Sequence, residues 1–181
     1  MTVLVCPLSR VAELVRSRRP NRVVSLLDPD FAFPELGPQY RDRHLRLSFH
    51  DAHDSSSGEV RPSAEHIERF LSFLAGWEPG TSLLIHCRAG IGRSTAAAYI
   101  ATCWRHPGAS ERRIAELLRE VAPLARPNET LIRLADTALN RGGRMSAAIS
   151  ETGRGLPWIE VDEGIPFELS LLESDGTAGA R

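Results

Sequence analysis

A cysteine and an arginine separated by five residues are the side chains of this sequence best suited to chemistry. Cys87 and Arg93 lie in the run HCRAGIGRST, together with Gly90 and Gly92. A glycine-containing loop between a strand and a helix can turn successive backbone N–H groups inward, which forms an anion site at the helix N-terminus. The same groups stabilise a thiolate at Cys87, and the guanidinium fork of Arg93 can hold two oxygens of a tetrahedral oxyanion. The pattern predicts a phosphate site with a cysteine nucleophile beneath the phosphorus.

A leaving oxygen needs a proton, which a thiolate cannot supply, so a carboxylic acid must reach the same pocket. Ligands of open α/β sheets bind beyond the carboxyl ends of the strands. The loop that follows the strand expected at 44–49 carries two candidates, Asp51 and Asp54. Asp28 and Asp30, which follow the preceding strand, remain further alternatives.

The elements that must position these residues follow from the apolar pattern, whose period alternates between about two and about 3.6, as is typical of an α/β domain. We expect a central, mostly parallel sheet of four to five strands flanked by helices. The chain divides into an α/β domain over 1–143, a C-terminal extension of the same domain over 144–173 and a flexible tail over 174–181. Strands are expected at 2–7, 22–27, 44–49, 81–86 and 166–172, helices at 9–19, 63–76, 94–104, 110–121 and 128–140, and a single turn at 145–149.

Composition excludes several classes of protein. All 22 basic residues of the 181 are arginine, so the chain can form neither a lysine Schiff base nor a Walker A phosphate loop. A formal net charge of -1 removes the general attraction that nucleic-acid binding needs. No segment approaches about 18 unbroken apolar residues, so no membrane contact is expected. The odd number of cysteines indicates a reduced, cytoplasmic protein, and the arginine bias suggests a bacterial source.

The run from His86 to Thr95 resembles the signature loop of the protein tyrosine phosphatase superfamily, whose pattern is His-Cys, five residues, Arg, then Ser or Thr. The resemblance implies that Cys87 is the nucleophile, that Ser94 eases departure of the thiolate and that His86 orients the loop. Asn128, in an Arg-Pro-Asn segment, resembles the residue that buttresses this loop, although it can equally be a simple helix cap. Phosphate would be bound by Arg88, Ala89, Gly90, Ile91, Gly92 and Arg93.

Among members of this superfamily, the short chain is most similar to the dual-specificity phosphatases, in which the acid directly follows an alternating strand. That favours Asp51, whereas the usual interval between acid and nucleophile in the family is nearer to that of Asp54. The implied activity is metal-independent hydrolysis of phosphotyrosine, with phosphoserine and phosphothreonine as further substrates, in a phosphorylated protein or a small phosphomonoester. No cofactor is implied, and the polar loop containing His50 and His53 is not expected to bind metal.

Other functions remain compatible with the same loop. One is a phosphate-binding module without turnover, and another is a loop-thiolate enzyme such as an arsenate reductase or a sulfurtransferase. Cys6, at the end of the first strand, can either trap a sulfenic acid on Cys87 as a disulfide or simply pack in the core. The sequence does not specify an oligomeric state.

Overall fold

The structure, a computed structural model, describes residues 2–51, 59–153, 155 and 162–171. Its sheet has five strands in the order β3-β2-β4-β1-β5. The first four are parallel, and β5 runs antiparallel to β1. This confirms the predicted fold class. The strands are β1 (Thr2–Pro7), β2 (Arg22–Leu27), β3 (His44–Ser48), β4 (Ser82–Cys87) and β5 (Phe167–Leu169).

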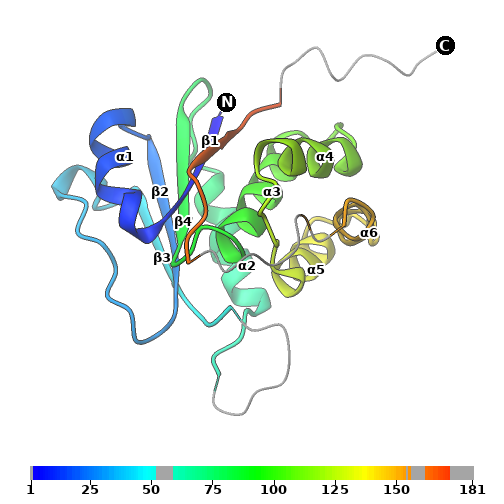
Figure 1. The fold of residues 1–181 in the computed structure, drawn as a ribbon, viewed down its shortest axis with the longest axis horizontal. Helices are drawn as coiled ribbons and strands as arrows, with labels where there is room; N and C mark the ends of the chain where they lie inside the picture. The colour runs from blue at the N-terminus through cyan, green and yellow to red at the C-terminus, as the bar shows by residue number, and fades with distance from the viewer. Residues whose placement is uncertain (1, 52–58, 154, 156–161, 172–181) are drawn as a thin grey trace.

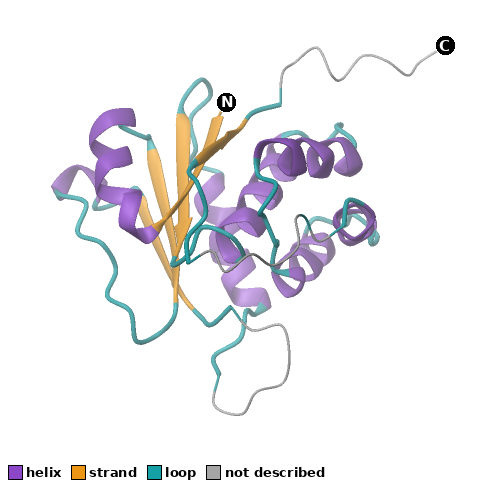
Figure 2. Ribbon diagram, viewed as in Figure 1, coloured by secondary structure: helices purple, strands orange, loops and turns teal. Residues whose placement is uncertain are grey.

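The helices form two unequal layers. Figure 1 shows α1 alone on one face of the sheet and the other helices on the opposite face, and Figure 2 shows the same arrangement by type of element. None of the described helices is long and apolar enough to cross a membrane. The helices are α1 (Val11–Arg18), α2 (Ala64–Leu74), α3 (Arg93–Arg105), α4 (Glu111–Val121), α5 (Glu129–Ala138) and α6 (Arg144–Glu151), with short 3-10 turns η1 (Leu8–Arg10) and η2 (Pro38–Tyr40).

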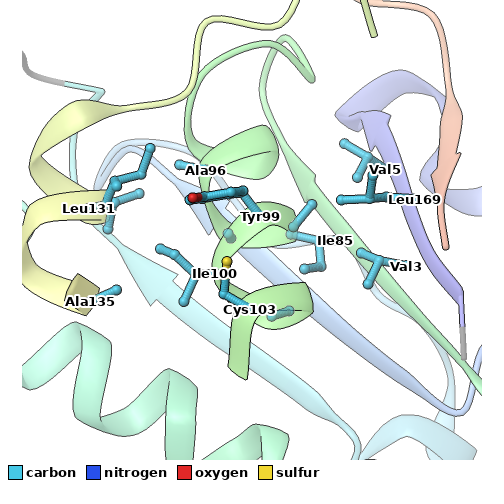
Figure 3. Packing of buried hydrophobic residues seen from close by; sticks show 14 of the residues in the cluster. Val3, Val5, Ile85, Ala96, Tyr99, Ile100, Cys103, Leu131, Ala135 and Leu169 are labelled. Atoms are coloured by element: carbon cyan, nitrogen blue, oxygen red, sulfur yellow. The ribbon is translucent and has the colours of Figure 1, made fainter. Parts of the chain in front are cut away.

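Helix α3 is the centre of the larger layer and is buried from Arg93 to Cys103. Its many alanines allow close approach to the sheet on one side and to neighbouring helices on the other. Figure 3 shows Tyr99 and Ile100 between the strands and α5. Burial of α3 from its first residue onward fixes its first turn, where the run from Cys87 to Arg93 ends.

Two details differ from the sequence-based expectation. The helix expected at 9–19 begins only at Val11, because Ser9 lies in η1, where its hydroxyl donates to the Glu163 carboxylate at 2.5 Å. The turn expected at 145–149 is part of a full helix, α6. The tail over 174–181 lies outside the described residues.

Asp136 explains why α6 forms where the sequence pattern is weak. Gly143 precedes α6 and has no side chain to cap it. The carboxylate of Asp136, on α5, accepts instead from the backbone N–H groups of Gly143 at 2.6 Å, Met145 at 2.7 Å and Ser146 at 3.1 Å. These are N–H groups that the helix itself cannot satisfy. A residue of one helix thus caps the next.

Replacing Asp136 with Ala should therefore lower the free energy of unfolding by about 1–3 kcal/mol, because buried N–H groups lose their acceptor. Urea denaturation measures this loss. The control is Glu120→Ala, which removes an exposed ion pair with Arg113 and should change stability by less than about 1 kcal/mol. Equal midpoints for the two variants would contradict the capping role of Asp136.

Candidate active site

The loop between β4 and α3, residues 87–93 (the 87–93 loop), directs its carbonyl groups outward. The C=O and N–H of one peptide plane point in opposite directions, so each outward carbonyl turns the next N–H inward. Four backbone N–H groups from three segments of the chain hold these carbonyls. They donate from Leu8 to Arg88 at 3.0 Å, from Gly164 to Ala89 at 2.7 Å, from Arg126 to Ile91 at 2.9 Å and from Asn128 to Gly92 at 3.3 Å.

The sulfur of Cys87 is contacted by one backbone N–H of this loop and by the first turn of α3. The N–H of Gly90 donates to Sγ at 3.2 Å, and the Ser94 hydroxyl lies 3.1 Å from it. Helix α3 begins at Arg93 without a side-chain cap, so its first N–H groups remain available to an anion. Although Cys87 is only 1% exposed, its sulfur has both a backbone N–H and a hydroxyl within hydrogen-bonding distance.

Both glycines of the 87–93 loop are required by close contacts. Gly90 has φ 75°, and a Cβ there would lie 2.7 Å from the backbone nitrogen of Pro7. At Gly92 a Cβ would collide with the Asp51 carboxylate. The first glycine thus allows the backbone to turn, and the second allows a carboxyl group to approach the loop.

Arg93 is 3% exposed and leaves one edge of its guanidinium open. Nη1 donates to Asp28 Oδ1 at 3.1 Å and to the Phe49 carbonyl at 2.6 Å, and Nη2 donates to Asp28 Oδ2 at 3.2 Å. Nε is buried without a hydrogen-bond partner among the described residues. Because the group is planar, Nε–H and the second N–H of Nη2 form a fork on one edge. That fork matches two oxygens of a phosphate.

Asp51 lies beside this open edge, with Oδ2 3.9 Å from Arg93 Nε. Its other oxygen accepts from Asn128 Nδ2 at 2.7 Å. The Oδ1 atom of Asn128 accepts from the Leu131 N–H at 3.0 Å and so caps α5. Asn128 therefore serves both as a helix cap and as a contact of the 87–93 loop, the two roles considered from the sequence.

The other predicted acids and cysteines are placed differently. Asp54 lies outside the described residues. Asp28 turns both carboxylate oxygens to Arg93, and Asp30 is exposed. Cys6 pairs in register with His86 and packs in the apolar cluster under α1, whereas Cys87 belongs to the cluster on the other face. Burial, together with the nearby Cys87, raises the pKa of the Cys6 thiol to about 12.

Arg88 is exposed, and its guanidinium lies over the Phe31 ring, 4.8 Å from the centroid. Its side chain thus contacts the segment after β2, while its carbonyl helps to hold the 87–93 loop. The sequence analysis anticipated phosphate contacts from the residues at 88–93. The geometry brings the backbone of this loop and the side chain of Arg93 to one site.

Sequence reasoning missed Ser25 and His44, which connect to the site through His86. Ser25 Oγ lies 2.5 Å from His86 Nε2 and 2.6 Å from His44 Nε2. Burial lowers the pKa of both histidines to about 4. The nearby Cys87 backbone partly opposes this lowering of the His86 pKa, and Nδ1 of His86 has no hydrogen-bond partner among the described residues. A serine in an otherwise apolar strand, RVVSLL, is the signal that could have drawn attention to it.

Comparison with known proteins was made on sequence and on structure. No family model matches the chain. Protein phosphatase Slingshot homolog 3 from Homo sapiens is 28% identical over 115 residues, which are 62% of this chain. The match covers only 16% of the length of that protein.

Two solved structures share the fold of this chain. The Yvh1 phosphatase domain from Chaetomium thermophilum has a TM-score of 0.54 and 21% identity, covering 79% of this chain and 93% of that one. The human tyrosine phosphatase-like serine/threonine/tyrosine-interacting protein has a TM-score of 0.61 and 17% identity, covering 77% of this chain and 92% of that one. The resemblance to the protein tyrosine phosphatase superfamily is thereby confirmed. A bacterial affinity stays a prediction.

The lowered pKa values of His44 and His86 predict how the free energy of unfolding depends on pH. The unfolded histidines take up protons below about pH 6.5, whereas the folded ones do so only near pH 4. The unfolded state therefore binds more protons between these values, so the free energy of unfolding should fall as pH drops from about 6.5 to about 5. Urea titrations across this range measure the slope. His44→Asn should flatten it, and a slope unaffected by this substitution would be inconsistent with the assignment.

Proposed function

We propose that this chain is a metal-independent phosphomonoester hydrolase that works through a phosphocysteine intermediate. Its preferred substrate is phosphotyrosine, with phosphoserine and phosphothreonine as further substrates. The proposal is carried by one combination: the Gly90 N–H donates to Cys87 Sγ, and one edge of the Arg93 guanidinium in the same loop has no hydrogen-bond partner among the described residues. Such a site stabilises both a thiolate and the charge that develops on a transferring phosphoryl group.

In the proposed first step, Sγ of Cys87 attacks phosphorus opposite the leaving oxygen. The S–P bond forms as the P–O bond to the leaving group breaks, and Asp51 gives its proton to that oxygen. Arg93 and the N–H groups of the 87–93 loop hold the three equatorial oxygens. Asp28 and the Phe49 carbonyl keep the guanidinium plane in place, because they occupy three of its N–H groups.

In the second step, water attacks the phosphocysteine. The Asp51 carboxylate accepts a proton from that water, the new P–O bond forms and the S–P bond breaks. The Ser94 hydroxyl, 3.1 Å from Sγ, donates to the departing sulfur and so stabilises it as a leaving group. The thiolate and the protonated Asp51 are restored, so the cycle balances without a metal ion.

The choice of substrate rests on the depth and charge of the site. Cys87 is almost fully buried, so a long aryl phosphate reaches the sulfur more readily than a short ester. Besides Arg93, the 87–93 loop offers only Arg88 as a cation, and that guanidinium lies over Phe31. Headgroups with several phosphates would need more positive charge. The match to a protein phosphatase supports a phosphorylated protein as the substrate.

We propose further that residues 1–143 form the catalytic unit and that the extension over 144–173 completes it. Two observations support this: β5 pairs with β1, and the N–H of Gly164 holds the Ala89 carbonyl. The rival chemistries are less well supported. Arsenate reduction needs a partner thiol, but Cys6 packs on the opposite face of the sheet from Cys87. A sulfurtransferase would need a persulfide donor.

Cys87→Ser should abolish hydrolysis of p-nitrophenyl phosphate, by at least about a thousandfold, because a serine hydroxyl is not ionised at neutral pH. Binding of inorganic phosphate, measured by calorimetry, should persist, since the N–H groups and Arg93 remain. Cys103→Ala, a change in the core away from the loop, is the control and should keep activity. The wild type should release one equivalent of phenol in a burst. Phosphate binding without any release of phenol would favour the binding module.

Asp51→Asn should slow release of poorly acidic leaving groups by roughly 10²–10⁴-fold and that of acidic phenols much less, because good leaving groups need no proton. Rates for a series of aryl phosphates measure this dependence. Asp54→Asn is the matched variant in the same loop and should behave like the wild type. The assignment fails if Asp51→Asn turns over phosphotyrosine normally while Asp54→Asn does not.

A further inference from the structure

A chain of hydrogen bonds crosses three neighbouring strands on the α1 face of the sheet and ends at His86, the residue that precedes the nucleophile. It starts at Arg46, whose Nε donates to His44 Nδ1 at 3.3 Å. Ser25 then lies between His44 Nε2 at 2.6 Å and His86 Nε2 at 2.5 Å. Ser25 and His86 are buried, and they are direct partners in the pairing of β2 with β4. His86 is covalently joined to Cys87.

The direction of these hydrogen bonds follows from the donors available. Because Nδ1 of His44 accepts from Arg46, the proton of this neutral ring is on Nε2, which donates to Ser25. The single hydroxyl proton of Ser25 is then left to donate to Nε2 of His86. That nitrogen is an acceptor, so His86 carries its proton on Nδ1, toward the backbone of Cys87. Every donor in the chain points toward the nucleophile.

We infer that Ser25 and His44 are positioning residues that fix the tautomer of His86 and, through it, the backbone of Cys87. The inference rests on the proposed function and names two residues that touch neither the substrate nor the sulfur. Hydrogen bonds aligned in one direction polarise one another, and the positive end of this chain is at His86, which directly precedes the 87–93 loop. The arrangement therefore favours negative charge on Cys87.

A merely structural role would have a different consequence. A buried serine that only satisfied its own hydroxyl could be replaced by alanine with a loss of stability alone. In the chain described here, Ser25→Ala leaves Nε2 of His86 without a donor. The ring can then move its proton to Nε2, so that Nδ1 becomes an acceptor beside the Cys87 backbone. The 87–93 loop would then lose the favourable interaction between the His86 ring and the Cys87 backbone at its first residue.

The test measures the thiolate directly and requires no turnover. Full-length protein is treated with iodoacetamide from pH 5 to 9, and the alkylation of Cys87 is followed by peptide mass spectrometry. Ser25→Ala should move the alkylation midpoint upward by about one pH unit, which is a roughly tenfold lower rate at low pH. Ser25→Thr retains the hydroxyl and should restore the wild-type midpoint. His44→Ala, farther from the sulfur, should shift it in the same direction by less.

The control is Val23→Ala, a buried position on the same strand and face, which disturbs packing without removing a hydrogen bond and should leave the midpoint unchanged. An unchanged midpoint in Ser25→Ala, or an equal shift in Val23→Ala, overturns the inference. If Ser25→Ala does not fold, the alkylation midpoint of His44→Ala tests the inference instead: an upward shift supports it, and an unchanged midpoint overturns it. A wild type that alkylates readily yet hydrolyses no phosphomonoester refutes the proposed function, while the shifts in the variants still decide the inference.

Discussion

The inward orientation of the backbone N–H groups around Cys87 is the constraint on which the rest of this structure depends. It exists only because the carbonyls of the 87–93 loop are satisfied elsewhere, and a buried carbonyl without a donor costs about 1–3 kcal/mol. The fold therefore brings together η1, the segment before α5 and the segment before β5. The central place of β4, between β2 and β1, lets neighbours approach the loop from both sides.

A second consequence concerns the charges around Arg93. A buried guanidinium is unfavourable without an acceptor, and Asp28 provides one on the end of the group that a phosphate does not need. Asp51 stands at the open edge, held there by Asn128. Two carboxylates near one arginine thus have separate positions: one orients the cation, and the other is the group that exchanges a proton in the proposed mechanism. The difference arises from which edge of the same planar group each one faces.

The parts of this arrangement that are local in sequence could be predicted, and those that depend on tertiary contacts could not. The run HCRAGIGRST contains its cysteine, glycines and arginine within ten residues, so the loop was recognisable without a fold. Helix α6 was underestimated because its cap, Asp136, belongs to another helix. Ser25 was overlooked because its partners lie on two other strands. Asp28 was considered only as an acid, since spacing says nothing about which donor a carboxylate faces.

The contact between Gly164 and Ala89 has a further consequence during synthesis of the chain. A ribosome makes proteins from the N-terminus, so residues 87–93 emerge well before the residue that holds the second carbonyl of the loop. Until Gly164 is added and the antiparallel edge strand closes, the loop lacks one of its four external supports. A nascent chain would thus contain Cys87 without its finished surroundings until synthesis has passed Gly164 and β5.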